Sequence, residues 1–248
     1  YARDRAGNET RSTFDYRVFP SEFHRSNLAI GEDFLRRVVP AIAARAPELA
    51  DENVNTTTDV TELLDLYLFI NGELRRQNNS TISAIAGNTA EHRLWEEPFR
   101  QLENSQVESR FADHRVYSHQ GREIDQQVHL GFDLASTTNA AIHASNTGRI
   151  VFANYLGIYG NCIIIDHGMG LQSLYAHLSS IDVSVGQEVK RNDPIGLSGQ
   201  TGLAGGDHLH FSLLLHGQPV TPVEWWDEHW IEDRIHRKLR EASTQTSG

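Results

Sequence analysis

The fold is decided by the stretch GRIVFANYLGIYGNCIIIDHGMGLQSLYAHL, residues 148–178. In it, short apolar runs are separated by turns that contain glycine, a pattern typical of β-strands. We predict strands over residues 148–154, 162–166 and 171–177, and another over 209–215. An antiparallel β-sheet is therefore expected from about residue 115 onward.

The stretch before this sheet has the spacing of helices. Apolar residues recur at helical intervals over 34–46, although Pro40 predicts a kink or a new helix start. Asp59 occupies the position of an N-cap before an apolar face that covers 60–74. Residues 95–102 predict another short helix. The sequence thus predicts the α+β class, with a helical N-terminal subdomain ahead of an antiparallel β-sheet.

Two short motifs carry residues with metal-binding chemistry. His208 and His210 are two apart, so in a strand both side chains lie on one face, about 6.6 Å apart. One imidazole could then bind an ion while its neighbour addresses water or substrate. His129 and Asp133 are four apart, roughly 13 Å in a straight strand, which is too far for one ion. The backbone must therefore bend between them, and Gly131 is the residue type that tolerates a bend.

The order of these motifs resembles a known family. HLGFD (129–133), YAHL (175–178) and HLH (208–210) follow one another with IIIDHG (163–168) and glycine-rich turns between them. Over residues 115–225 this arrangement resembles the zinc peptidases of the lysostaphin/LytM type, family M23. The resemblance implies a LytM/lysostaphin-like catalytic domain whose groove carries zinc, and the cleavage of peptide bonds in bacterial cell walls.

The resemblance also implies a role for each motif residue. A catalytic zinc keeps three protein ligands and one open position, which His129, Asp133 and His210 would satisfy with one ion per chain. Zinc lowers the pKa of a bound water from about 15.7 toward 7 and polarises a carbonyl group. His177 and His208 are the catalytic candidates, because imidazole gains and loses protons near neutral pH. The sequence does not decide which of the two takes the proton from water.

Three other features have less specific meanings. His167 is expected to fill a turn, and Asp207 either orients His208 or faces solvent. The tryptophans at 225, 226 and 230 are expected to pack the C-terminal helix on the domain rather than to stack on sugar rings.

Composition and the two chain ends limit the remaining possibilities. The formal net charge of −11 argues against nucleic-acid binding, which needs clustered cations. Cys162 is the only cysteine, so no internal disulfide can form, and no apolar run is long enough for a membrane span. The chain begins at Tyr1, so we expect a missing upstream segment with an export signal and a location in the cell envelope, periplasmic or extracellular.

We expect four parts along the chain. Residues 1–18 resemble the last strand of a bacterial immunoglobulin-like repeat, and residues 19–114 form the helical subdomain. Residues 115–230 form the zinc peptidase domain, followed by a C-terminal helix and polar tail over 231–248. The helical subdomain either shapes one wall of the groove or covers it, with a side chain placed over the zinc. Asn71, Glu73, Asn78 and Asn79 are the candidates for such an inhibitory contact.

Three functional hypotheses follow. The first is a zinc endopeptidase that cuts stem peptides or cross-bridges of peptidoglycan. The second is a non-hydrolytic relative that activates a cell-wall amidase, and the third is a wall-binding module. The resemblance implies that such activators lack some of the zinc or catalytic residues, whereas this chain keeps all of them, which favours the endopeptidase. The bond that is cleaved and the oligomeric state do not follow from the sequence.

Overall fold

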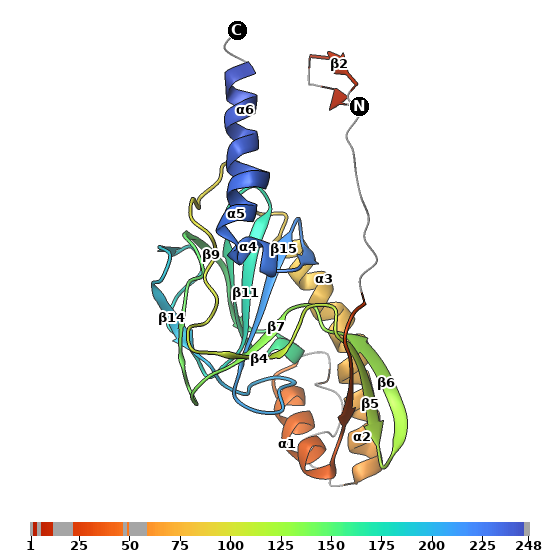
Figure 1. Ribbon diagram of the computed structural model, residues 1–248. Coiled ribbons are helices and arrows are strands. Elements are labelled where there is room, and N and C mark those ends of the chain that lie inside the picture. Colours follow the sequence, from red (N-terminus) through yellow and green to blue (C-terminus); the bar gives the residue numbers. More distant parts are fainter. Residues whose placement is uncertain (1, 4–5, 12–21, 47–48, 50–58, 246–248) are drawn as a thin grey trace.

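A large antiparallel sheet forms the centre of the computed structural model, which describes residues 2–3, 6–11, 22–46, 49 and 59–245 (Figure 1). Its strands follow the order β13-β9-β10-β11-β15-β7-β4, and β16 pairs with β15. The strands span β4 (Gln106–Ser109), β7 (Phe132–Ala135), β9 (Gly148–Tyr155), β10 (Asn161–Asp166), β11 (Leu171–Leu178), β13 (Glu188–Val189), β15 (Leu209–Leu215) and β16 (Gln218–Val220). The predicted strands at 148–154, 162–166, 171–177 and 209–215 are therefore confirmed.

A helical region packs against one face of this sheet (Figure 1). It contains α1 (Glu32–Ala43), α2 (Val60–Phe69), the π-helical turn η2 (Ile70–Leu74) and α3 (Arg75–Ile85). Its own three-stranded sheet has the order β3-β5-β6, with β3 (Arg25–Ala29), β5 (His114–His119) and β6 (Arg122–Val128). The α+β class predicted from the sequence is thus confirmed.

The helices begin and end partly as predicted. The Asp59 side chain accepts a hydrogen bond of 2.8 Å from the Thr61 amide and so caps α2. From there α2, η2 and α3 run on as one continuous helix, in which apolar residues of the inner face are buried. Pro40 lies inside α1, so the new helix start that it suggested is not present.

The short helix predicted around residues 95–102 is absent. Residues 88–105 contain no helix, and their amides bond to other segments, as the Phe99 amide does to the Trp225 carbonyl at 3.0 Å. Trp95 and Phe99 pack on Trp225 with ring centroids 5.8 and 5.9 Å apart. Tertiary packing of these aromatic rings overrides the local spacing that suggested a helix.

The large sheet has a second apolar layer on its other face. That layer includes Trp95, Phe99 and Trp225 together with the sheet of β8 (Ala141–His143), β12 (Ser180–Ile181) and β14 (Pro194–Leu197). The chain then closes with α4 (Val223–Trp226), α5 (Glu228–Ile231), the π-helical η4 (Glu232–His236) and α6 (Arg237–Gln245). Trp225, Trp226 and Trp230 pack in this layer, as the packing hypothesis required.

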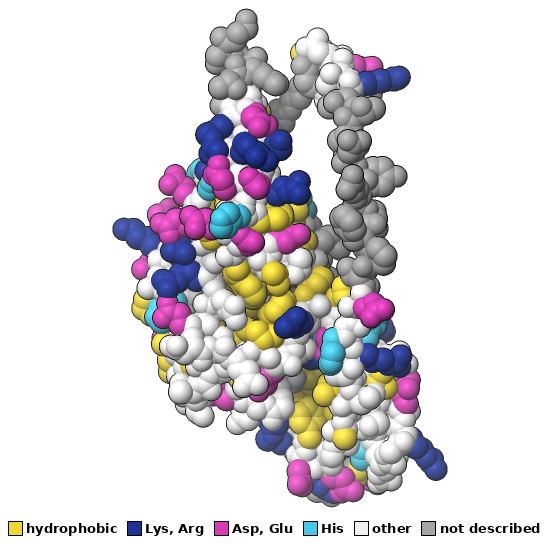
Figure 2. Space-filling model, in the orientation of Figure 1, with side chains coloured by type: hydrophobic (Ala, Val, Ile, Leu, Met, Phe, Trp, Pro, Cys, Tyr) yellow, Lys and Arg dark blue, Asp and Glu magenta, His cyan; other side chains and the backbone are white. Residues whose placement is uncertain are grey.

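The surface reflects these layers. Figure 2 shows charged side chains gathered on the projecting end of the molecule that α6 forms in Figure 1, and hydrophobic side chains over the middle of the same face. None of the described helices is long and apolar enough to cross a membrane.

The two regions exchange strands near residue 114. β4 lies before it and pairs with β7 of the large sheet, whereas β5 begins there and pairs with β3 on one side and β6 on the other. The boundary expected between a helical subdomain (19–114) and a peptidase domain (115–230) stays a prediction, because an exchange of strands does not by itself define domains. Most of the immunoglobulin-like match over 1–18 lies outside the described residues. Within its described part, β1 (Ala2–Arg3) pairs with β2 (Glu9–Thr10). Residues 246–248 of the predicted tail also lie outside the described residues.

Candidate metal centre and active site

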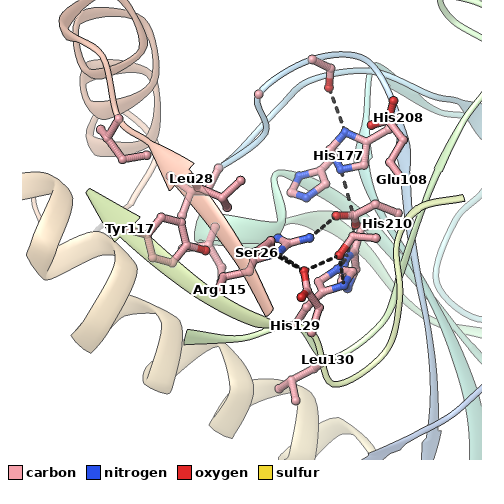
Figure 3. Close-up of a pocket in the computed structure, with 18 of the residues that line it drawn as sticks. Ser26, Leu28, Glu108, Arg115, Tyr117, His129, Leu130, His177, His208 and His210 are labelled. Carbon is pink, nitrogen blue, oxygen red and sulfur yellow. Dashed lines mark hydrogen bonds and ion pairs between the residues drawn. The ribbon is translucent and has the colours of Figure 1, made fainter. Parts of the chain in front are cut away.

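Three side chains converge where β7 pairs with β15 of the large sheet (Figure 3). His129 follows β6, Asp133 lies in β7 and His210 lies in the neighbouring strand β15, paired with Asp133. His129 Nε2 lies 2.9 Å from Asp133 Oδ1 and 2.9 Å from His210 Nδ1, and His210 Nδ1 lies 3.0 Å from Asp133 Oδ1. All three side chains are buried. The pairing of β7 with β15 therefore brings the three predicted metal ligands together, and His129, Asp133 and His210 form what we call the metal cluster.

The bend predicted between His129 and Asp133 is present at Gly131. Residues 129–131 lie outside regular strands, between β6 and β7. A Cβ atom at Gly131 would lie 2.5 Å from the Phe211 carbonyl oxygen and 2.8 Å from Cε1 of His210. Glycine is therefore required here because β15 approaches the backbone closely, and not because of a left-handed backbone conformation.

Hydrogen bonds on the outer nitrogens fix the tautomers of both histidines. His129 Nδ1 lies 3.0 Å from the Arg110 carbonyl oxygen, which can only accept, so this nitrogen carries a proton. Ser212 donates its hydroxyl proton to the Leu130 carbonyl at 2.9 Å, so it accepts from His210 Nε2 at 3.0 Å. In their neutral forms both rings thus turn a lone pair toward Asp133. An outer partner that fixes the ring in this way is typical of metal-binding histidines.

This cluster has the chemistry of a zinc site. In the neutral rings, two imidazole lone pairs and a carboxylate oxygen face one another without a proton between them. Their mutual repulsion is relieved only by a positive charge, either a proton on one ring or a bound metal ion. Four ligands at about 2.0 Å from a tetrahedral zinc lie roughly 3.3 Å from one another, close to the separations observed here. Burial, the largest single influence, acts to raise the pKa of Asp133, but the neighbouring His129 together with hydrogen bonds from His129, His208 and His210 outweighs it and holds the pKa well below its usual range. The residues present fit the metal.

His177 reaches the same site through a bulge at the end of β11. Ala176 pairs with His210 and shares its face of the sheet, so in a regular strand His177 would point to the opposite face. His177 instead has a left-handed backbone with φ of 63°, and the pairing of β10 with β11 shifts register beside it. The ring of His177 lies 4.9 Å from the ring of His208, measured between centroids. The bulge therefore redirects His177 toward the metal cluster.

His177 and His208 turn their free nitrogens toward the cluster. His177 Nδ1 lies 2.8 Å from the Thr201 carbonyl and His208 Nδ1 lies 2.9 Å from the Gly206 carbonyl, so both donate there. His208 Nε2 lies 3.5 Å from Asp133 Oδ1. Burial, and then the charges of the other histidines, lower the pKa of His177 well below its usual value. Burial, the largest single influence, acts to lower the pKa of His208, but the contact and charge of Asp133 together with the Gly206 carbonyl and Glu108 outweigh it and raise the pKa.

A cavity of about 480 Å³ joins this site to the helical region. His177, His208 and the metal cluster line one side of it, and Leu28 and Tyr117 lie on the opposite side (Figure 3). Arg37 of α1 donates to the Ala204 carbonyl at 3.1 Å and so ties the helical region to the loop before His208. The volume lies within the range of small-molecule sites, roughly 300–1,000 Å³.

Two charged residues beside the site were missed by the sequence analysis. Arg115 extends from β5 to the cluster and lies 2.5 Å from Asp133 Oδ2 (Figure 3). Asp113 accepts hydrogen bonds from Ser26 at 2.5 Å and from Ser109 at 3.1 Å. Ser109 in turn lies 3.2 Å from His129 Nδ1. No motif spacing marks Arg115 or Asp113, because their role depends on strand β5 lying beside the large sheet.

The candidates for an inhibitory contact have other partners. Glu73 pairs with Arg76, and Asn71 bonds to Asp125 at 2.7 Å. Asn78 accepts from the Ile158 amide at 2.9 Å and Asn79 accepts from the Tyr159 hydroxyl at 2.8 Å. These two asparagines therefore hold the short helix η3 (Gly157–Tyr159) against the site, with the Tyr159 ring 5.7 Å from the His210 ring. Of the two hypotheses for the helical region, these contacts favour a wall of the groove.

His167 and Asp207 lie outside the metal cluster. His167 is fully buried, with Nδ1 2.7 Å from the Thr147 carbonyl and Nε2 2.7 Å from the Ser173 hydroxyl. Asp207 accepts from Ser198 at 2.6 Å and from the Asn139 amide at 3.0 Å. Asp207 thus fixes the loop before His208 as a half-buried residue of a bend, and its bonds go to Ser198 and Asn139 whereas His208 Nδ1 donates to the Gly206 carbonyl.

Part of the chain is similar to known proteins. Residues 127–222 match the family model described as peptidase family M23. The chain is 40% identical over 97 residues to the DD-carboxypeptidase/endopeptidase Mpg of Neisseria meningitidis serogroup B, a match over 39% of this chain and 22% of that protein. It is 38% identical over 96 residues to the peptidoglycan DD-endopeptidase ShyA of Vibrio cholerae, over 39% and 22%. It is also 35% identical over 95 residues to the murein hydrolase activator EnvC of Escherichia coli, over 38% and 23%. The chain thus matches less than a quarter of the length of each relative.

Proposed function

Because residues 127–222 belong to peptidase family M23, we propose that this chain is a zinc-dependent endopeptidase that hydrolyses peptide bonds of bacterial peptidoglycan. His129, Asp133 and His210 would hold one zinc ion, and His177 and His208 would assist the reaction. The observation that carries the proposal is the convergence of two imidazole lone pairs and a carboxylate oxygen within 3.0 Å of one another. Structural packing alone does not explain such a cluster, since nothing in it donates a proton.

Each histidine of the second pair has a place that suits proton transfer. Zinc, when bound, would activate a water molecule and polarise the peptide carbonyl. The protons at Nδ1 of His177 and His208 are held by backbone carbonyls, so in both neutral rings Nε2 is free to accept a proton. By receiving a proton and returning one, these rings would serve as base and acid. The two rings lie 4.9 Å apart between centroids, so both would stand beside the same reacting amide.

Peptidoglycan is proposed as the substrate because ShyA, whose matched segment is 38% identical to this chain, is named a peptidoglycan DD-endopeptidase. A substrate of this kind places the protein in the cell envelope. The cavity between the large sheet and the helical region would admit a peptide segment, with the metal cluster on one wall. The η3 helix lines the cavity with Ile158 and Tyr159, and Arg37 ties α1 to the loop before His208.

A second candidate is suggested by the likeness to EnvC, named a murein hydrolase activator. A protein of that kind would act by binding another hydrolase and would need no turnover of its own. The complete set of metal and proton-transfer residues favours hydrolysis, because a binding role would not require four histidines with inward lone pairs.

The proposal is tested by measuring zinc content and the release of peptides from purified peptidoglycan sacculi by mass spectrometry. We expect about one zinc per chain and new amine termini. His129→Ala and Asp133→Ala should lose both zinc and release, whereas His208→Ala should keep most of the zinc and lose turnover. His229→Ala, at an exposed histidine of α5, is the matched control and should resemble the wild type. Equal release by all four variants would refute the mechanism, and bound zinc with no release would favour the activator.

A further inference from the structure

The cavity extends beyond the metal cluster to a buried hydroxyl that has no partner. Tyr67 in α2 is fully buried, and among the described residues nothing forms a hydrogen bond with its hydroxyl. Tyr67 also lines the cavity that contains the metal cluster. Leaving a buried hydroxyl unpaired is unfavourable, so such groups are rare and usually have a reason.

A positive charge stands near this hydroxyl on the same cavity wall. Arg75, the first residue of α3, lines the cavity, and no carboxylate of the described part of the chain forms an ion pair with it. The guanidinium is held by Asn71, through the backbone carbonyl at 3.0 Å and the side-chain oxygen at 2.5 Å. Since Asn71 is itself anchored on Asp125, the guanidinium is fixed in place before any ligand arrives.

The π-helical turn η2 explains why Tyr67 and Arg75 share this wall. In a regular α-helix, positions eight apart differ in direction by about 80°. A π-helical turn accommodates one extra residue, which reduces that difference to about 20°. Because η2 lies between Tyr67 and Arg75, both side chains line the same cavity. Helical irregularities of this kind are frequent at functional sites.

Two guanidinium groups line this cavity, and their partners differ. Arg115 pairs with Asp133 at 2.5 Å, so its charge is balanced at the metal site. Arg75 lines the cavity as well, and among the described residues no carboxylate forms an ion pair with it. Of the two, Arg75 is therefore the group whose charge a bound ligand could balance.

We propose that Arg75 and the Tyr67 hydroxyl form a subsite for a free carboxylate of the peptide substrate. A carboxylate accepts from both groups, which would pair the guanidinium and give the hydroxyl its missing partner. The inference rests on the proposed function in that it takes the ligand to be a peptide, and it deepens that function by naming a group that the substrate must carry. The subsite would select chains with a free carboxylate near the scissile bond.

The test uses the zinc-loaded chain and the probe N-acetyl-D-alanyl-D-alanine, compared with its C-terminal amide by calorimetry. Tyr67→Phe removes only the unpaired hydroxyl, and Arg75→Met removes the charge while Arg75→Lys keeps it. The matched control is Arg76→Met, whose exposed guanidinium pairs with Glu73 and does not line the cavity. Melting temperatures are measured alongside, since Tyr67→Phe should fold at least as well as the wild type.

We expect the wild type to bind the acid more tightly than the amide, by roughly 10- to 100-fold. Arg75→Met and Tyr67→Phe should weaken binding of the acid and leave that of the amide unchanged, while Arg76→Met should resemble the wild type and Arg75→Lys should keep part of the preference. Equal binding of acid and amide by the wild type, no binding of the acid, or an equal loss of both in Arg75→Met would overturn the inference.

Failure of the carboxylate subsite and failure of the proposed function give different results. If sacculi are not cleaved but the acid is preferred through Arg75, the carboxylate subsite stands and the hydrolytic function fails. If sacculi are cleaved and acid and amide bind alike, the reverse holds.

Discussion

The large sheet and the helical region hold the same cavity by different means. The large sheet and the segments that lead into its strands supply the groups that would bind metal or move protons, and each of these histidines is fixed by a carbonyl or hydroxyl close by. The helical region supplies charged residues that lie outside the sequence motifs. Arg115 forms an ion pair with Asp133, and Arg75 lines the same cavity. The candidate metal ligands and proton-transfer histidines thus belong to short sequence motifs, whereas the charged residues around them depend on how the two regions pack.

The strongest test of the local half is Gly131→Ala. The added Cβ would lie 2.5 Å from both the Phe211 carbonyl oxygen and the Ser212 hydroxyl, so β7 and β15 must separate. We expect a loss of about 3 kcal/mol in the free energy of unfolding and a loss of zinc. Denaturant unfolding and zinc content check this. Gly31→Ala, where a Cβ meets nothing within 4 Å, is the control and should lose under about 1 kcal/mol. A stable Gly131→Ala variant with full zinc would show that the sheet tolerates a looser pairing.

The next test concerns acid sensitivity of the large sheet. Burial lowers the pKa of His167 from its ordinary value of 6.5 to about 4. The unfolded chain therefore takes up a proton first as pH falls, and stability present above pH 6.5 is lost progressively down to about pH 4. The expected loss attributable to His167 is about 3 kcal/mol. Unfolding free energies of the wild type and His167→Gln between pH 7 and 4 should diverge in slope, with the flatter curve in the variant. Parallel curves would remove His167 as the cause.

Arg115 tests whether the helical region matters to the metal. Arg115→Met removes the group that fixes the second oxygen of Asp133, and removal of such outer contacts weakens metal binding by roughly 10- to 100-fold. Arg115→Lys should recover part of this, although it lacks the planar donor pair. A competition titration with a zinc chelator measures both. Tighter zinc binding in Arg115→Met would mean that charge repulsion outweighs orientation, and it would reverse the role given to the helical region.

The smallest effect is expected at strand β3. Ser26→Ala removes a hydrogen bond of 2.5 Å to Asp113 and should lower the free energy of unfolding by about 1 kcal/mol, with zinc content unchanged. Urea unfolding provides the measurement. A loss of zinc in this variant would show that β3 positions His129 through Asp113 and Ser109, and the separation between the two regions would then be less sharp.

The sequence was sufficient for the parts of the molecule whose pattern is local. Four strands of the large sheet (β9, β10, β11 and β15), the Asp59 cap and the bend at Gly131 could be predicted because each depends on residues a few positions apart. The placement of Trp95 and Phe99 could not, since rings from residue 225 decide it.

The same limit applies to the site. His129, Asp133, His177, His208 and His210 lie in short motifs, and the structure brings all of them together. Arg115 and Asp113 carry no motif, because β5 pairs in parallel with β3, which lies far away in sequence. The direction of His177 was also beyond prediction, since a bulge in β11 reverses the face that simple alternation would give.

The exchange of strands between the two regions has a mechanical consequence. The chain crosses between them at residues 110–113 and again at 129–131, and these two crossings contain Asp113 and His129. A rotation of one region against the other would twist the backbone that carries the predicted metal ligand His129. Binding of the ion would therefore restrict this rotation, and removal of the ion would allow it.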